Sequence, residues 1–231
     1  MVRVGKVEAG TISDWHPEPG TLVSWQPSRG SLAKAAKAPI SPVPPSYMQA
    51  HHLRNFRSYR ERGLEMSRLL ISSWDIPGIC DIRTMTHVVN AHMRRHDTFR
   101  SWFEHTEAIT SCAGPSSAND IQFVAVEHGE LTTQSQWRER LLATRVRWSG
   151  GACASRSFSV RTTSPSAWPL TTFTVTRCSS RGVCEIHLMY LALVSGGAPL
   201  RLAEPGSYDN YCNRQREHIS GLTLDSPVMS K

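Results

Sequence analysis

The chain has 231 residues, of which 39% are hydrophobic, so it can bury one sizeable core or two small ones. No run of eighteen apolar residues occurs, and the first 20 residues lack the apolar stretch of a secretory signal, which predicts a cytoplasmic protein without a membrane span. The formal net charge of +7 would suit a nucleic-acid partner, but its distribution argues against one.

Almost all of the basicity lies in residues 145–182. This segment holds six Arg and fourteen Ser or Thr but no Asp, Glu, His or Lys, whereas outside it 20 basic residues face 19 acidic ones. No aromatic stripe accompanies the charge, so we expect no nucleic-acid partner. The six cysteines form no CxxC pair and are expected to be reduced and mostly structural.

The first 45 residues are rich in Pro and Gly. They are predicted to form extended segments and turns that pack along a domain edge through Trp15 and Trp25. We place a boundary after Pro45 and expect one globular lobe over residues 46–231.

From Ser46 onward the hydrophobic spacing predicts regular elements. In order, these are a helix from Ser46 that ends at Gly63, a strand over Leu69–Trp74, a turn at Pro77-Gly78, a helix over Ile82–His96, and strands over Phe99–Phe103 and Ile121–Val126. A helix capped by Thr132 or Thr133, a strongly apolar helix over Val183–Val194 and a last helix over Ser207–Ser220 complete the order. Helices alternating with strands predict an α/β (α+β layered) domain.

Several histidines resemble parts of known sites. His51 and His52 lie in the first helix without an Asp four residues after His52, so we interpret them as structural. His92 and His96 share a helix face at a spacing that can bind zinc, but no third ligand is evident, and core or capping roles are favoured. His187 is interpreted as a partly buried histidine of the apolar helix.

Two local patterns resemble the condensation domains of peptide synthetases and their relatives with the chloramphenicol acetyltransferase-like fold. Residues 46–53, SYMQAHHL, are similar to the opening S-x-x-Q helix, and residues 95–103, RHDTFRSWF, are similar to the R-H-[ED]-x-[LF]-R-x-x-F junction, where Arg95 and Asp97 are expected to brace the fold. Residues 127–131, 193–200 and 206–212 add a resemblance to mycobacterial polyketide-associated acyltransferases, which acylate hydroxyls of cell-envelope glycolipids. The resemblance covers about Met1 to Thr144 and Val183 to Ser226.

This resemblance implies the N-terminal lobe of a two-lobe fold, with the second lobe absent. It implies O-acyl transfer from a CoA or carrier-protein thioester as co-substrate, with no other cofactor. The partners that it implies are a polyketide synthase or an acyl carrier protein, together with peripheral contact with a membrane surface.

The family's catalytic H-x-x-x-D motif should fall shortly before residues 185–187, but residues 145–182 contain neither His nor Asp. In the family the His is the general base on the acceptor hydroxyl, a role suited to an imidazole with a pKa near ~6.5. The Ser and Thr found instead scarcely ionise at pH 7. No GxSxG, GxGxxG or P-loop occurs. We therefore expect no catalytic, cofactor-binding or metal-binding residues in this chain.

The genetic code allows a test within the printed residues. In a reading frame shifted by one base, each new codon joins the last base of one codon to the first two bases of the next. With allowed choices for the free bases, and starting at Val160 and Arg161, residues 160–182 can be reread as ADHFTFCVAIDHLHGDAVFVAG. That string contains H-L-H-G-D after an alternating apolar strand. We infer a local change of reading frame; the alternative is a native Ser/Thr-rich surface loop, which would be unusually long.

The segment as printed is predicted to be poorly packed. Pro165 and Pro169 do not suit central strands, and six uncompensated Arg are costly to bury. Three hypotheses follow: a truncated, catalytically inactive acyltransferase; a non-catalytic interaction module that contacts a polyketide synthase or carrier protein; or a residual enzyme completed by a separately encoded lobe.

Overall fold

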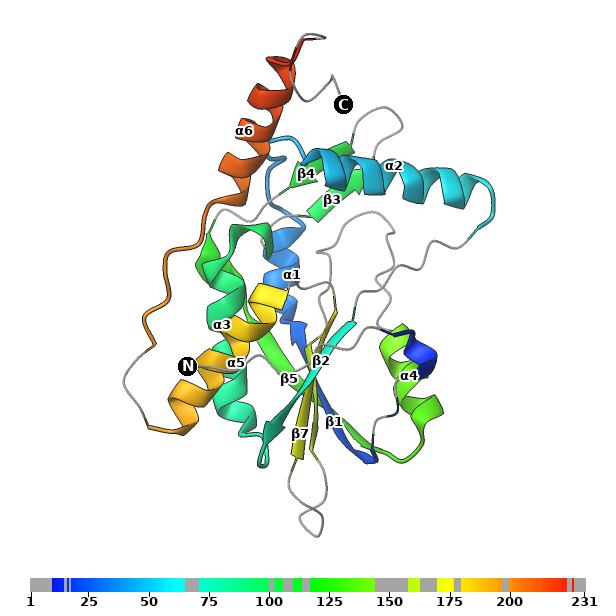
Figure 1. Ribbon diagram of the computed structural model, residues 1–231, viewed down its shortest axis with the longest axis vertical. Coiled ribbons are helices and arrows are strands. Elements are labelled where there is room, and N and C mark those ends of the chain that lie inside the picture. The colour runs from blue at the N-terminus through cyan, green and yellow to red at the C-terminus, as the bar shows by residue number, and fades with distance from the viewer. Residues whose placement is uncertain are drawn as a thin grey trace.

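A computed structural model of the chain describes residues 10–14, 16, 18–64, 71–99, 102–105, 110–113, 117–143, 158–162, 170–176, 180–196, 200–223 and 226. In these residues a five-stranded antiparallel sheet has the order β2-β7-β6-β1-β5 (Figure 1). Its strands are β1 (Gly20–Pro27), β2 (Ile71–Pro77), β5 (Phe123–Leu131), β6 (Phe158–Thr162) and β7 (Leu170–Thr176). A separate antiparallel pair consists of β3 (Trp102–His105) and β4 (Thr110–Ala113).

The helices are α1 (Arg29–Ala35), α2 (Tyr47–Glu61), α3 (Ile82–Arg95), α4 (Gln134–Ala143), α5 (Ser180–Val194) and α6 (Tyr208–Ser220). Short 3-10 turns lie at Ile12–Asp14, Asp97–Phe99 and Ala118–Asp120. Figure 1 shows α3 and α5 side by side against the sheet, whereas α2 is drawn toward the top of the view. Among the described residues, no helix is both long and apolar enough to cross a bilayer.

The main core lies between the sheet and helices α3 and α5. The periodic apolar residues of α3 turn toward the sheet, where they meet side chains from β1, β2 and β5. The cluster consists of Val23, Trp25, Ile76, Cys80, Met85, Val88, Val89, Met93, Phe99, Ile121, Phe123, Ile186 and Tyr190. Because α5 supplies Ile186 and Tyr190 to this cluster, it is part of the core and not an appendage.

A buried amide side chain fixes α3 against the sheet. Nδ2 of Asn90 donates to the carbonyls of Phe123 and Thr86, at 2.9 Å each, and its Oδ1 accepts from the amide of Phe123 at 2.8 Å. Buried polar groups are retained where their hydrogen bonds are made. Asn90 therefore sets the position of α3 relative to the first residue of β5.

Local signals explain where the helices begin. Oγ of Ser46 accepts from the amide of Gln49, whose Oε1 accepts from the amide of Ser46, which is a complete capping box for α2. Asp81 caps α3 through the amides of Arg83 and Thr84. Ser207 caps α6. The predicted helix starts are confirmed to within about three residues.

An irregularity in β5 brings its polar residues next to β1. The register between the two strands shifts between Thr21 and Val23, so β5 contains one extra residue there. Gly129 has a φ of +77°, a left-handed conformation that glycine adopts without strain. The bulge places His128 against Ser24 of β1, at 2.7 Å between Nε2 and Oγ.

The predicted layered α/β class and the single-lobe character are confirmed, but several element predictions were wrong. Phe99 lies in a 3-10 turn and not in a strand, because the chain turns before β3 begins. Helix α1 and strand β4 were missed. Trp25 does not line a domain edge: β1 is the second strand from the edge of the sheet, and Trp25 is fully buried. Leu69 and Leu70 lie outside the described residues.

The segment 145–182 contributes two strands that the sequence did not predict. Strands β6 and β7 pair with each other and sit between β1 and β2. Pro165 and Pro169 lie outside the described residues, as does most of the segment for which poor packing was predicted. The two strands do carry the alternation of a strand, contrary to the expectation for this segment: Phe158 and Val160 of β6 are paired with Val175 and Phe173 of β7.

Candidate functional site

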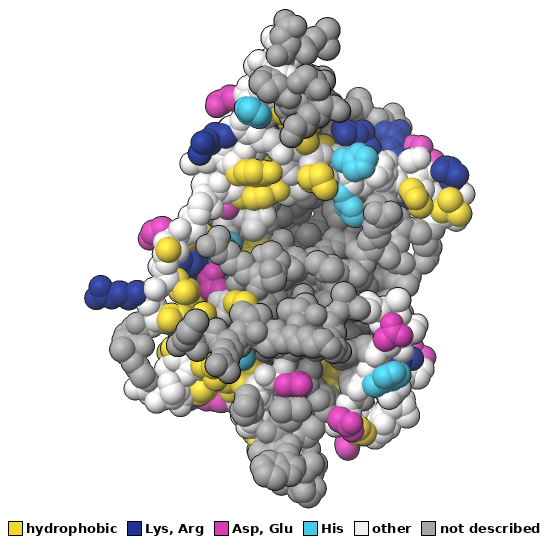
Figure 2. Space-filling model, viewed as in Figure 1, with side chains coloured by type: hydrophobic (Ala, Val, Ile, Leu, Met, Phe, Trp, Pro, Cys, Tyr) yellow, Lys and Arg dark blue, Asp and Glu magenta, His cyan; other side chains and the backbone are white. Residues whose placement is uncertain are grey.

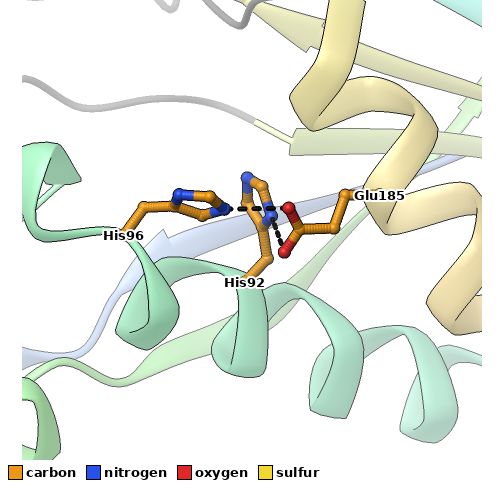
Figure 3. A group of neighbouring side chains, drawn as sticks. All are labelled: His92, His96 and Glu185. Carbon is orange, nitrogen blue, oxygen red and sulfur yellow. Dashed lines mark hydrogen bonds and ion pairs between the residues drawn. The ribbon is translucent and has the colours of Figure 1, made fainter. Parts of the chain in front are cut away.

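His92 of α3, His96 directly after the last residue of α3, and Glu185 of α5 converge where these helices meet (Figure 3). Nε2 of His96 lies 2.9 Å from Oε2 of Glu185, and Nδ1 of His92 lies 3.3 Å from Oε1 of the same carboxylate. Nε of Arg95 lies 3.1 Å from Oε1. The side chain of His92 is 1% exposed and that of Glu185 is 12% exposed, so the group belongs to the interior of the lobe.

This group corrects the sequence analysis, which found no third ligand near His92 and His96. Glu185 is separated from His96 by 89 positions, and only the packing of α5 on α3 brings it there. The aromatic ring of Phe99 lies 5.2 Å from the imidazole of His92 and 5.7 Å from that of His96, between ring centroids. Core or capping roles were predicted for the two histidines: His92 is buried in the core and His96 is the partly exposed C-cap of α3, and a carboxylate partner accompanies both.

Ser24 and His128 could in principle form a nucleophile and its general base. The residue that contacts the other nitrogen of His128 is an arginine, however, and not a hydrogen-bond acceptor. Arg140 donates from its guanidinium to Nδ1 of His128. Nδ1 must therefore accept, which leaves the proton of the neutral imidazole on Nε2, where it donates to Oγ of Ser24. Burial, with a further contribution from Arg140, lowers the pKa of His128, so the ring is neutral at pH 7. This tautomer cannot take a proton from Ser24.

Cys80 is also unsuited to nucleophilic chemistry. Burial raises the pKa of its thiol to about 11, so almost none of it is thiolate at neutral pH. The hydroxyl of Tyr190 accepts from the amide of Asp81 at 2.8 Å, and burial raises its pKa to about 12. These two side chains act as core residues that join α5 to the start of α3.

An open groove of about 1110 Å³ lies beside the histidine group, between α3, α5 and the segment 200–207. Its wall combines apolar and basic side chains, among them Met189, Leu193, Leu202, Arg94 and Arg95. Two of the basic groups are engaged: Nε of Arg94 donates to the carbonyl of Ile121, and Arg95 contacts Glu185 and the carbonyl of Ala203. A third, Arg201, is exposed, so the groove combines apolar surface with one exposed positive charge.

The other residues singled out from the sequence have structural surroundings. Nε2 of the exposed His51 lies 3.0 Å from Nδ2 of Asn55. Asp97 braces α6, because its carboxylate accepts from the amide of Tyr208 and from Oγ of Ser207. Arg95 braces α5 through Glu185. His187 is half-buried, as predicted, and burial lowers its pKa.

The position expected for the family's catalytic motif is β7 and the passage from it to α5. Strand β7 ends at Thr176 and α5 begins at Ser180. The printed sequence of residues 170–182 contains no His, Asp or Glu. General-base catalysis therefore has no suitable side chain at this place.

Comparison with known proteins points to the same family as the sequence motifs, the mycobacterial polyketide-associated acyltransferases. No profile of a known protein family matches the chain. The chain is 44% identical, over 236 residues, to PapA1 of Mycobacterium bovis (strain BCG / Pasteur 1173P2), named 2'-acyl-2-O-sulfo-trehalose (hydroxy)phthioceranyltransferase; the match covers 98% of this chain and 44% of PapA1. Trehalose-2-sulfate acyltransferase PapA2 of the same strain is 39% identical over 239 residues, which is 94% of this chain and 46% of PapA2.

A solved structure of PapA2 acyl transferase superimposes with a TM-score of 0.82 at 39% identity, over 94% of this chain and 47% of that one. The fold is thus that of an acyltransferase lobe. The chain belongs to the mycobacterial polyketide-associated (PapA) acyltransferase family. It spans about half the length of the relatives that it matches.

Proposed function

We propose that this chain represents one lobe of an acyltransferase that moves an acyl group from a CoA or carrier-protein thioester to a hydroxyl of a cell-envelope glycolipid. The similarity to PapA1 and PapA2, whose names describe acyl transfer to sulfated trehalose derivatives, supports the reaction class. In such a reaction an imidazole takes the proton of the acceptor hydroxyl as its oxygen attacks the thioester carbonyl. The carbon–sulfur bond then breaks and the thiol leaves.

We propose further that the chain as printed is catalytically inactive. The observation that carries this proposal is the lack of His, Asp and Glu in residues 170–182, within a chain that is 44% identical to PapA1 over 98% of its length. Three described histidines in polar clusters offer no replacement: His128 is held in the wrong tautomer, and His92 and His96 lie against Glu185. A change of reading frame across residues 160–182 accounts for the loss.

A thioester assay tests the inactivity. The chain is incubated with a long-chain acyl-CoA and trehalose 2-sulfate, thiol release is followed, and full-length PapA2 serves as the positive control. We expect no release above that of a protein-free blank. Turnover by the unaltered chain that is abolished by His187→Ala, the described histidine nearest in sequence to the lost motif, would refute the proposal.

The second candidate function is a non-catalytic module that binds a polyketide synthase or carrier protein. One observation favours it: exposed basic side chains gather over α2 in Figure 2, and they include Arg54, Arg57, Arg60 and Arg62. Only one acidic residue, Glu61, lies among them, and it pairs with Arg57 at 2.6 Å. A partner that binds this face would be acidic. Salt-sensitive capture of the carrier protein, lost on Arg54→Glu with Arg60→Glu but kept with Arg83→Glu on α3, would support this function.

A further inference from the structure

We propose that His92, His96 and Glu185 form a binding site for a divalent first-row metal ion, for which Zn²⁺ is the best match. The ligand atoms of the three residues all lie within 4.8 Å of one another. Bonds of about 2.0 Å to a tetrahedral ion place its ligand atoms about 3.3 Å apart. The separations of 2.9 Å and 3.3 Å are to different oxygens of Glu185 and the ligand atoms lie within 4.8 Å of one another, so side-chain shifts on the order of 1 Å would bring them around an ion.

The chemistry of the donors selects the ion. Two imidazole nitrogens and one carboxylate oxygen suit zinc, whereas Ca²⁺ and Mg²⁺ take oxygen ligands almost exclusively. His92 lies in the last turns of α3 and His96 is the C-cap that follows Arg95, so the end of one helix positions both. Glu185 completes the set from α5 (Figure 3). Three protein ligands leave a fourth position for water.

The surroundings of the three side chains favour a cation. Oε1 of Glu185 is buried, and among the described residues no hydrogen bond of good geometry reaches it, although Nε of Arg95 lies 3.1 Å away. A buried carboxylate oxygen without hydrogen bonds is costly, and coordination to a metal ion removes that cost. The ring of Phe99 packs near both imidazoles and limits their motion.

Arg95 limits the affinity of this site. Its guanidinium lies beside the same carboxylate and repels a dication. It also holds Glu185 in place, as outer-shell partners of ligating carboxylates do. Repulsion by Arg95 weakens metal binding, whereas its positioning of Glu185 strengthens it. We expect the repulsion to be the larger effect, because the protein interior screens charge poorly. Removal of this positive charge should therefore tighten metal binding.

A bound ion would join α3 to α5, the helix that directly follows the segment 145–182. Both helices belong to the main core, so the ion would stabilise the lobe and would not take part in acyl transfer. This inference does not depend on the proposed function, because its three residues lie outside the segment in which the reading frame is in question.

Zinc binding by the full 231-residue chain tests the inference. Equilibrium dialysis with metal analysis should give one equivalent of zinc, and zinc at a hundredfold excess over Kd should raise Tm by about 5–10 °C, reversibly with EDTA. Glu185→Gln and His96→Gln should each weaken binding at least about tenfold. His87→Gln, an exposed histidine on the same helix, is the matched control and should leave binding unchanged.

Arg95→Gln keeps all three ligands and provides a second test that does not rely on the folding of a ligand variant. We expect it to tighten zinc binding about tenfold or more. X-ray absorption of the bound zinc should show nitrogen and oxygen neighbours only. Binding by Glu185→Gln as tight as that of the unaltered chain, sulfur neighbours from the free cysteines, or no binding by the unaltered chain and Arg95→Gln alike would each overturn the inference.

Discussion

Helix α3 and the strand pair β6–β7 both lie at the centre of the lobe, but their sequences differ in kind. In α3 the residues Met85, Val88, Val89 and Met93 recur at helical spacing and are all buried. In β6 and β7 the apolar residues alternate instead at the strand period of two, and the ladder pairs Phe158 with Val175 and Val160 with Phe173. Helix α3 thus places four apolar residues in the buried core, whereas the sequences of β6 and β7 carry only two and three apolar residues.

The contrast has a simple physical origin. Ladder hydrogen bonds use main-chain groups that every residue except proline carries. The free energy of the core instead comes from apolar area removed from water, which depends on the identity of each side chain. A change of reading frame would alter the side chains of the segment. The flanking elements β1, β2 and α5 would keep their sequences, so β1 and β2 could still pair with the backbone of the altered segment.

The largest expected effect is a difference in the loss of stability between two Trp→Ala variants, one in the core and one in the segment 145–182. Trp25→Ala should destabilise the chain by about 3–5 kcal/mol. The reason is that Trp25 of β1 is fully buried in the core and its Nε1 donates to Oγ1 of Thr86 in α3 at 2.8 Å. The matched variant is Trp168→Ala in the segment 145–182, for which we expect a change below about 1 kcal/mol. Urea unfolding measures both. Equal losses for the two variants would remove the distinction between the regions.

Hydrogen exchange should give the next largest difference. Amides of α3 are expected to exchange only through global unfolding, whereas those of β6 and β7 should exchange at least about a hundredfold faster, which is about 2.7 kcal/mol. The reason is that the sequences of β6 and β7 carry few apolar residues, so we expect their local opening to cost less than that of α3. Protection of 158–162 and 170–176 as deep as that of 82–95 would show that this segment is well packed.

The smallest effect concerns the first turn of α3. Asp81→Ala should cost about 1 kcal/mol at pH 7, because Asp81 accepts from two amides and from Oγ1 of Thr84. The bond from the Thr84 hydroxyl, followed by that from the Thr84 amide, lowers the pKa of Asp81 below its unfolded value. Its contribution is therefore complete above pH 4 and is lost as pH falls through the lowered pKa.

Asp81→Asn is the control for this dependence, since Asn caps as well as Asp but does not titrate. Unfolding measured between pH 6 and pH 3 should show a steeper loss of stability for the unaltered chain than for Asp81→Asn. Parallel pH profiles for the two proteins would contradict the assignment of this capping carboxylate.

Features set by neighbouring residues could be predicted from the sequence. The starts of α2, α3 and α6 depend on Ser46, Asp81 and Ser207, whose hydrogen bonds reach only two or three residues along the chain. The family likewise follows from two short motifs. Helix α1 was missed because it has only seven residues and lies in a Pro- and Gly-rich stretch.

Features set by distant contacts could not be predicted. Strands β6 and β7 owe their place to pairing with β1 and β2, which lie far away in sequence. The contact of Glu185 with His92 and His96 could not be predicted, because the sequence of an apolar helix does not indicate which other helix it will pack against. The tautomer of His128 depends in the same way on Arg140, which belongs to the next helix.

The nucleotide sequence of the gene decides whether the catalytic motif is encoded but not translated. If the reading frame changes locally, Thr171 is encoded by ACC and Val175 by GTG, so that the neighbouring phase reads histidine across 171–172 and aspartate across 175–176. One-base insertions or deletions should then lie near Thr144 and Gly182. A different third base at either codon would contradict the account, since no histidine or aspartate could then be read at those places.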